Sequence, residues 1–343
     1  MTSDSMLREV HVRDAIGLVL AHDLTQILPG TFKGRLFKKG HIIREQDMER
    51  LLDIGKEHIY ILSLEDGYIH EDEAAIRMAE ALRGENLSLT ETHEGKVSLI
   101  SDIHGLVKVN REFVDAANAI EQVVVSTLLN NSVVQSKGAV VGTRVIPLVV
   151  KEQTVCQIEQ LALQLKQQAE REAGPITVKP FLPMKVGLIT TGSEVYNGRI
   201  TDKFGPIVMD KITAFGSTVI EQRLAPDDRD QIVAEIQYFA ELGVDMILLT
   251  GGMSVDPDDR TPGAIKQAGA DIVSYGTPML PGSMLLMAYL PVGDRRVPVL
   301  GLPGCVMHDP YTSFDVLLPR ICAGETIERS DITAMGYGGL YRC

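Results

Sequence analysis

The chain has 343 residues, of which 45% are hydrophobic and 23% are charged, and its formal net charge is −13. This length has room for two or three domains with a substantial core, and the composition is ordinary for a soluble globular protein. The acidic balance argues against nucleic-acid binding, which needs a basic face. No apolar run approaches the length of a membrane span, and the first ten residues lack the apolar core of a signal peptide. We therefore expect a cytoplasmic protein without a membrane partner.

The four cysteines are scattered along the chain and form no closely spaced pair. Both a structural zinc site and a disulfide framework would need paired cysteines, so we expect neither. The residues are Cys156, Cys305, Cys322 and Cys343.

Residues 1–70 are predicted to form a small β-containing domain. Between residues 10 and 64, apolar and polar residues alternate around two turn signals, Pro29-Gly30 and Gly40. A short helix is expected at 45–55, and a strand at 58–62. A basic cluster in this domain either contacts an acidic partner or a phosphate, or is a solvated strand face whose lysines prevent pairing at a sheet edge. Its members are Lys33, Arg35, Lys38 and Lys39.

Residues 71–174 are predicted to form a second domain of the α+β class. A helix at 71–82 carries acidic residues in its first turn and is followed by Gly84, which is typical of a helix end. A second helix at 154–173 stops at Gly174-Pro175, where we place the main domain boundary. The other expected elements are β-like runs in 96–109, a strand or strand pair in 138–150, and a segment at 112–129 that is first helical and then β-branched, so that its class stays open.

From residue 175 to residue 330 the pattern becomes an alternation of strands and helices. Alternation of this size implies an α/β domain with a doubly wound, mostly parallel sheet. The last residues, 331–343, are predicted to form a C-terminal tail. Strands are expected at 185–190, 218–223, 245–250, 271–275, 284–290 and 297–300, and helices at 204–215, 228–242, 261–267 and 309–321.

The stretch from Thr250 to Asp259, TGGMSVDPDD, follows the apolar strand at 245–250 and is where we expect the chemistry. Gly251 and Gly252 allow a sharp turn and a close approach of the backbone to a ligand. Strand, glycine turn, acidic loop and helix form the geometry of a ligand crevice in an open α/β sheet. The alternative is that the glycines and aspartates only punctuate and solvate the connection. The loop also carries Ser254, Asp256, Asp258 and Asp259, and the next helix is expected to have Thr261 as N-cap and Pro262 as its first residue.

Four loops are expected to meet at one edge of this sheet, because parallel strands have their carboxyl ends on the same side. They span 190–195, 227–228, 250–259 and 302–306. Grouped carboxylates suit a hard cation such as Mg²⁺, which bridges to phosphate. The alternatives are helix capping for one of the two aspartates at 227–228 and an ordinary solvated loop residue for Glu194. The carboxylates are Glu194, Asp227, Asp228, Asp258 and Asp259.

Residues 185–324 resemble the molybdopterin-binding domain shared by molybdenum insertases (the MoeA and gephyrin E type), their adenylyltransferase sisters and CinA-type proteins. TGSE at 191–194 is similar to the insertase TGDE, and APDD at 225–228 resembles the turn before the second helix. GGMSVDPDD at 251–259 matches GGxSxGxxD except for the second loop glycine, and LPGCV at 302–306 resembles LPGNP. Four motifs in the right order are a specific signal for the domain.

This resemblance implies a ligand and a set of site residues. The ligand would be molybdopterin, the pterin dithiolene of the molybdenum cofactor with its terminal phosphate, or the adenylated form. Glu194, Asp228 and Asp259 match acidic positions associated with metal or molybdate chemistry, and Asp258 would complete a Mg²⁺ site with Asp228 and Asp259. The expected cofactor cradle consists of Thr191, Gly192, Ser193, Gly251, Gly252, Ser254, Pro303, Gly304 and Cys305.

The chain also departs from the insertase pattern. Asp256 replaces a glycine, and MLPGSM at 279–284 stands where insertases carry a lysine-bearing turn of the PGKP type. Cys305 and Val306 replace the Asn-Pro of the LPGNP turn; Cys305 is either a soft ligand or, as we favour, a small buried apolar residue. The N-terminal half lacks the SAMDGYA-bearing region, which EDGY at 65–68 resembles only superficially.

Three functions are compatible with these observations. The first is an enzyme of molybdenum cofactor biosynthesis that handles molybdopterin or its adenylate with Mg²⁺. The second is a non-catalytic cofactor carrier or sensor whose N-terminal domains contact a client molybdoenzyme. The third is a CinA-like nucleotide pyrophosphatase. The missing lysine and the atypical N-terminal half favour the carrier, whereas Glu194, Asp228 and Asp259 favour the enzymes. A homo-oligomer is possible.

Overall fold

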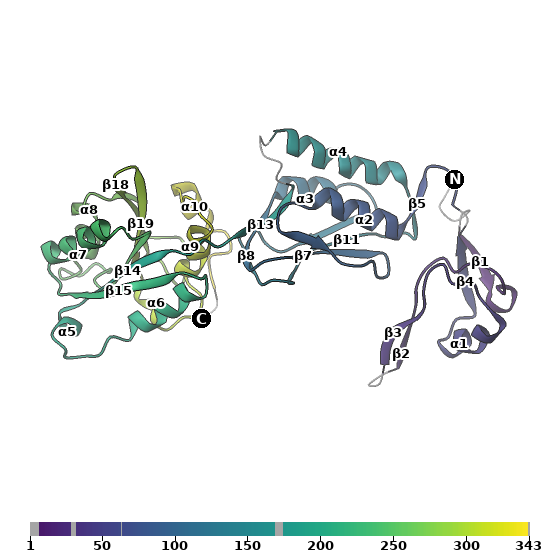
Figure 1. Cartoon of the computed structure of the whole chain (residues 1–343), viewed down its shortest axis with the longest axis horizontal. Coiled ribbons are helices and arrows are strands. Elements are labelled where there is room, and N and C mark those ends of the chain that lie inside the picture. The colour runs from purple at the N-terminus through teal and green to yellow at the C-terminus, as the bar shows by residue number, and fades with distance from the viewer. Residues whose placement is uncertain (1–6, 29–31, 63, 169–173, 342–343) are drawn as a thin grey trace. The chain divides into compact units, whose positions relative to one another are not determined.

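The computed structural model describes residues 7–28, 32–62, 64–168 and 174–341. Its contacts divide the chain into two compact units, Met1–Lys179 and Pro180–Cys343 (Figure 1). The predicted turn at Pro29-Gly30 and the predicted end of the helix at residue 173 lie outside the described residues. Among the described helices, none is long and apolar enough to cross a membrane.

The first unit begins with a small β-rich part. Strand β1 (Leu7–His11) pairs antiparallel with β4 (His58–Leu62), and β2 (Leu24–Leu28) pairs antiparallel with β3 (Phe32–Phe37). Helices η2 (Val12–Asp14), η3 (Glu45–Asp47) and α1 (Met48–Asp53) complete it. Two members of the basic cluster form ion pairs within the unit, Arg35 with Asp23 at 2.8 Å and Lys39 with Asp72 at 3.3 Å. At least these two cations are therefore partly neutralised by the protein itself.

The rest of the first unit is built on a four-stranded antiparallel sheet, in the order β6 (Leu87–Leu89), β7 (Lys96–Ser101), β11 (Ala139–Val145), β9 (Val123–Thr127). Helix α2 (Glu71–Leu82) packs on β7 and β11, and α4 (Glu152–Gln168) packs on α2. The open segment at 112–129 is resolved as helix α3 (Arg111–Asn118) followed by β9. Two smaller sheets accompany it. One has three strands in the order β10 (Val133–Val134), β8 (Gly105–Val109), β13 (Ile176–Pro180), and the other pairs β12 (Val149–Lys151) with β5 (Tyr68–His70).

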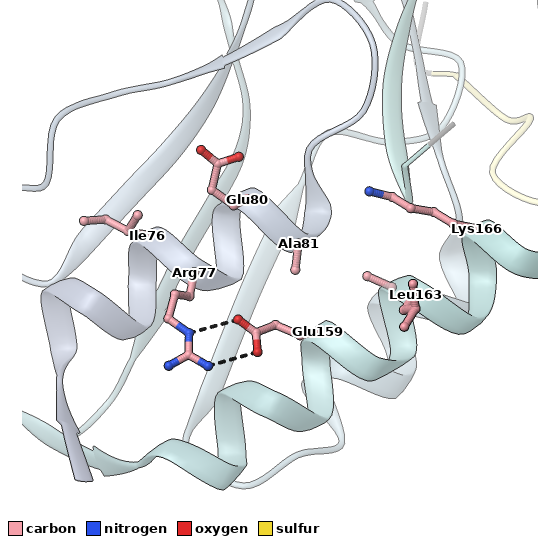
Figure 2. A pocket seen from close by; sticks show the side chains of 8 residues that line it. Ile76, Arg77, Glu80, Ala81, Glu159, Leu163 and Lys166 are labelled. Carbon is pink, nitrogen blue, oxygen red and sulfur yellow. Dashed lines mark hydrogen bonds and ion pairs between the residues drawn. The ribbon is translucent and has the colours of Figure 1, made fainter. Parts of the chain in front are cut away.

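An ion-pair cluster fixes α4 against α2. The Arg77 guanidinium of α2 donates to both carboxylate oxygens of Glu159 on α4, each at 2.9 Å (Figure 2). It also donates to Glu152 at 2.7 Å. These hydrogen bonds, those to Glu159 first, raise the pKa of Arg77. Helix α4 begins at Glu152, two residues earlier than predicted, directly after β12 ends at Lys151. A groove of about 340 Å³ lies beside the ion pair, lined by Ile76, Glu80, Ala81, Ala162, Leu163 and Lys166.

The second unit contains a six-stranded sheet with helices on both faces. Its order is β15 (Thr218–Ala225), β14 (Lys185–Thr191), β16 (Met246–Thr250), β19 (Arg295–Leu302), β18 (Leu286–Val292), β17 (Asp271–Tyr275). The first four strands are parallel, and β18 is antiparallel to both β19 and β17. One apolar core contains residues of α6 (Phe204–Thr213), α9 (Ser313–Cys322) and α10 (Arg329–Ala334), and the other those of α7 (Arg229–Leu242) and α8 (Thr261–Gln267). The prediction of a doubly wound, mostly parallel sheet is confirmed.

The sequence prediction misplaced some elements near the C-terminus. The last predicted helix starts at Ser313 rather than at residue 309, because Thr312 and Asp315 form a capping box that fixes the start there. The short helix η4 (Gly304–Met307) and a loop occupy the preceding residues. Strand β18 begins two residues later than expected, and the predicted tail contains part of α10, which has its own capping box at Glu328 and Asp331.

Helix α7 lies very close to the centre of the sheet. Gly187 is in the middle of β14, and the ring of Phe239 on α7 fills the space where a side chain would be. A Cβ atom at position 187 would lie 2.5 Å from ring carbons of Phe239, which is fully buried. The absence of a side chain at Gly187 therefore sets how closely α7 approaches β14.

The second unit is predicted to fold without the first. Strand β13 ends at Pro180 and pairs with β8 of the first unit, whereas the two cores of the second unit contain only residues beyond Pro180. We therefore choose a fragment that begins at residue 180 rather than at the predicted boundary at Pro175. We expect residues 180–343 to unfold cooperatively in urea, as measured by circular dichroism. A fragment that stays unfolded while the full chain is folded would show that the units depend on a shared core.

Candidate functional site

The carboxyl ends of four neighbouring strands lie at the same edge of the six-stranded sheet. In the parallel register Thr190 is opposite Thr250, Thr250 is opposite Leu302, and Thr191 is opposite Ala225. The four loops that the sequence analysis singled out leave the sheet at these residues. We call this region the carboxyl edge.

The loop after β16 has a backbone conformation that requires glycine. Gly251 and Gly252 have φ angles of +87° and +57°, which side-chain-bearing residues rarely adopt. A Cβ atom at Gly251 would collide with the carbonyl oxygen of Thr191, and one at Gly252 would lie 2.8 Å from Thr261 Oγ1. The two glycines therefore let the loop fold back onto the ends of β14 and α8.

Four consecutive amides of this loop have no partner among the described residues. The backbone N–H groups of residues 252–255 make no hydrogen bond there. The hydroxyl of Tyr275, at the end of β17, donates to the carbonyls of Met253 at 2.8 Å and Ser254 at 3.2 Å. Because the C=O and N–H of a trans peptide point in opposite directions, this contact directs the amides of Ser254 and Val255 away from Tyr275. Successive free amides of this kind form a concave anion-binding element.

The proton of Tyr275 is retained under all ordinary conditions. Partial burial, and then the charge of Asp259, raise the pKa of the Tyr275 hydroxyl above its usual value. The hydroxyl therefore stays a hydrogen-bond donor to the loop. No sequence pattern indicates this role for Tyr275, which is 21 residues from the nearer of its two acceptors.

Each of three carboxylates at the carboxyl edge accepts a hydrogen bond from a local backbone amide. Asp228 is the N-cap of α7 and accepts from Gln231 at 2.9 Å, whereas Asp227 accepts from Ser193 at 2.8 Å. Asp259 accepts from the amide of Asp256 at 2.9 Å and so closes the loop. The capping alternative is thus the structural role of Asp228. The described residues contain no group of three or more His, Cys, Asp or Glu side chains placed to hold a metal ion.

The other acidic residues lie apart from these bonds. Asp258 is exposed on the loop after β16. Glu194 is in the short helix α5 (Ser193–Tyr196), and its carboxylate lies beside Gly192, 3.2 Å from where a Cβ atom would stand. The expected metal roles of these two residues stay predictions.

The predicted cradle residues divide into buried and open positions. Thr191 is buried and its hydroxyl donates to the carbonyl of Thr250 at 3.1 Å, so it supports the edge from below. Pro303 is also buried, whereas Cys305 is partly exposed and its carbonyl accepts from the amides of His308 and Asp309. Gly304 is exposed, and no protein atom lies within 4 Å of the Cβ position. Gly304 therefore leaves open space at the edge.

The turn at 279–284 is tied to the protein interior. The carbonyl of Gly282 accepts from Ser313 Oγ at 2.7 Å and from Thr277 Oγ1 at 2.8 Å. No cation stands in this turn, in agreement with the absence of the insertase lysine from the sequence.

The predicted role of Thr261 as N-cap is wrong. Helix α8 begins at Thr261, Arg260 has the cap position, and no side chain caps the helix. The reason is that the Thr261 hydroxyl donates to the carbonyl of Gly251 at 2.9 Å. The hydroxyl therefore stabilises the glycine turn rather than the helix.

Two parts of the chain match known protein families. Residues 187–322 match the family described as "Probable molybdopterin binding domain". Residues 9–63 match a family described as "Domain of unknown function (DUF8806)".

Curated relatives match the chain over part of their length. The molybdopterin molybdenumtransferase of Synechococcus elongatus is 30% identical over 167 residues, which are 46% of this chain and 40% of that protein. The CinA-like protein of Mycobacterium tuberculosis is 34% identical over 77 residues, which are 22% of this chain and 18% of that protein. The chain thus spans less than half the length of either relative.

Solved structures of low similarity include MoaB from Thermus thermophilus, with 19% identity and a TM-score of 0.33 over 41% of this chain and 98% of that one. A molybdenum cofactor biosynthesis protein from Pyrococcus furiosus covers 92% of this chain and 63% of its own, with 13% identity and a TM-score of 0.26. The sequence matches at residues 187–322 contain the strands, the glycine turn and the acidic loop of the carboxyl edge. Over these residues the chain matches the molybdopterin-binding domain family.

Proposed function

We propose that the carboxyl edge binds molybdopterin through the phosphate end of the cofactor. The observation that carries this proposal is the run of free amides at residues 252–255, which follows two glycines of positive φ. Amides held in place before the ligand arrives stabilise an anion without reorganising. The Tyr275 hydroxyl holds two of the peptide units in position, and the open space at Gly304 gives a bulky ligand access.

Magnesium fits this edge less well than phosphate does. Asp228 and Asp259 each use one carboxylate oxygen for a backbone amide, and the described residues gather no group of three metal-ligating side chains. Mg²⁺ needs near-octahedral oxygen geometry, which it usually completes with water and substrate phosphate. We therefore assign the protein's own contribution to binding and orientation, and we assign no reaction step to a metal.

This arrangement favours a cofactor-binding protein over an insertase or a pyrophosphatase. The carboxylates that an enzyme would use for metal chemistry act as a helix cap and a loop closure, and the lysine of the insertase turn is absent. The relative named as a CinA-like protein keeps pyrophosphate cleavage as the second candidate. Release of AMP from adenylated molybdopterin or from a dinucleotide would establish an enzymatic function in place of simple binding.

Gly304→Val tests the site with little effect on the fold. The added side chain meets no protein atom within 4 Å of its Cβ, so we expect the midpoint of urea unfolding to stay the same. The same side chain occupies the open space at the edge, and we expect the affinity for molybdopterin, measured by anaerobic calorimetry, to fall at least tenfold. Unchanged affinity would show that the ligand does not use this face.

Asp259→Asn separates metal-free from metal-assisted binding. The amide oxygen of asparagine can still accept from the amide of Asp256, so the loop should keep its shape. With metal-free binding, loss of one negative charge near the ligand phosphate should raise the affinity a few-fold, and EDTA should have no effect on the wild type. A drop in affinity that appears only in the presence of Mg²⁺ would instead assign Asp259 to a metal.

A further inference from the structure

Arg229 crosses from one helix to the next at the carboxyl edge. It is the first residue of α7, directly after the cap residue Asp228. Its guanidinium lies against the backbone of Gly263 in the first turn of α8, and Nε and Nη2 are 3.1 Å from where a Cβ atom would stand. Because Gly263 has no side chain, the guanidinium can lie directly against the first turn of α8.

Arg260 is at the end of the loop after β16, three residues before Gly263. It is half-buried, follows Asp259 directly and precedes α8. Neither Arg229 nor Arg260 forms an ion pair with any of the described residues. We call these two residues the arginine pair.

The acids next to the arginine pair in the sequence accept hydrogen bonds from other groups. On the two sides of Arg229, Asp228 accepts from the amide of Gln231 and Asp230 accepts from Gln267 Nε2 at 2.8 Å. Beside Arg260, Asp259 accepts from the amide of Asp256. Some other arginines of this unit do form ion pairs: Arg295 pairs with Asp245, and Arg320 pairs with Glu325 and Asp331. Two guanidinium groups without an ion pair among the described residues are available to an external anion, and guanidinium binds phosphate in bidentate geometry.

We infer that the arginine pair binds the phosphate of the ligand and supplies the positive charge that the turn at 279–284 lacks. The inference rests on the proposed function and adds the ligand class: a phosphate ester is required, and a neutral pterin without phosphate should gain nothing from either arginine. The free amides at 252–255 and the arginine pair then contact the same anionic group, which offsets the charge of the surrounding carboxylates.

The test compares full-length variants on matched probes. The probes are molybdopterin released anaerobically from a purified molybdoenzyme, the same material after phosphatase treatment, and inorganic pyrophosphate. For Arg229→Gln and Arg260→Gln we expect affinity for molybdopterin to fall at least tenfold each, with less than a twofold change for the dephosphorylated pterin. Arg295→Gln is the control, because Arg295 is at the start of β19, at the opposite edge of the sheet, and should change neither affinity.

Gly263→Ala gives a readout that a merely structural role would not produce. Alanine in place of a helical glycine favours the helix, so the melting temperature should rise. The added methyl group displaces the Arg229 guanidinium, so molybdopterin affinity should fall several-fold although the protein is more stable. A rise in melting temperature with unchanged affinity would count against the inference.

The possible failures can be told apart. Two outcomes would contradict the role of the arginine pair and leave the proposed function standing. In the first, both arginine variants bind molybdopterin as tightly as the wild type does. In the second, the variants lose the same affinity for the phosphorylated and the dephosphorylated pterin. Pyrophosphate binding that depends on the arginines, without binding of either pterin, would overturn the proposed function and keep the anion site. No binding of any probe to the wild type would overturn both.

Discussion

Gly252→Val is expected to weaken molybdopterin binding about a hundredfold or more. Gly252 has a φ of +57°, a conformation that costs a β-branched residue roughly 1–3 kcal/mol. The new side chain also meets Thr261 Oγ1 at 2.8 Å and Thr191 Oγ1 at 3.2 Å. Both costs vanish if the loop moves, and a moved loop no longer presents the free amides of residues 252–255 together. The measurement is anaerobic calorimetry with molybdopterin on wild type and variant.

Gly293→Val is the matched control for this experiment. Gly293 also has a φ of +57°, but it is in the turn between β18 and β19, at the opposite edge of the sheet, and no atom lies within 4 Å of its Cβ position. The backbone cost should therefore be similar, whereas the affinity should not change. Equal loss in both variants would mean that reduced stability, not the position of the loop, explains the effect at Gly252.

Glu71→Gln should stabilise the first unit at high pH and leave it unchanged at low pH. Glu71 is buried and its carboxyl group lies against the turn at Gly95; desolvation, with a smaller effect of Asp72, raises the pKa of Glu71 to about 7. Because the pKa of Glu71 is raised in the folded state, its contribution to the free energy of unfolding is fully present below pH 4.5, the ordinary pKa of a glutamate. This contribution is lost as the pH rises through 7, the pKa in the folded state. The pKa difference corresponds to roughly 3 kcal/mol at pH 8, and the helix N-terminus reduces this to about 2 kcal/mol.

Urea unfolding at pH 4 and pH 8 measures this effect as the difference between variant and wild type. Glutamine has the shape of the protonated glutamate, so the difference should be near zero at pH 4 and about 2 kcal/mol in favour of the variant at pH 8. Glu73→Gln is the control, because Glu73 is in the same turn of α2 but exposed. A pH-independent difference for Glu71→Gln would show that the carboxyl group is already charged at neutral pH.

The fold of the second unit was predictable because its signals are local. The run DMILLT predicted β16 because a strand that is covered on both faces of the sheet consists of consecutive apolar residues, without alternating polar ones. All five residues of β16 are buried. The carboxyl edge then followed from topology alone, since parallel strands must end on the same side. Boundaries set by caps were less certain: Asp227 and Asp228 are equally good cap residues, and only the geometry shows that Asp228 has this role.

The contacts that shape the site could not be predicted, because they join distant segments. Tyr275 reaches the loop after β16 only because β17 and β19 are both antiparallel to β18, so that β17 ends at the same edge. No periodicity within residues 271–275 indicates that pairing. The same holds in the first unit, where the short strands β5 and β12 pair across about 80 residues. The position of Arg229 against Gly263 likewise depends on how α7 packs on α8.

The close contact between Gly187 and Phe239 links packing inside the domain to the position of residues at the carboxyl edge. Helix α7 is held at a spacing that only a bare backbone at position 187 permits, and the same helix carries Asp228 and Arg229 at its first turn. A methyl group at position 187 would push α7 away from β14. The N-terminal end of α7 would then shift relative to the loop after β16. The position of α7 relative to the loop after β16, where we propose that the ligand binds, therefore depends on a residue within β14.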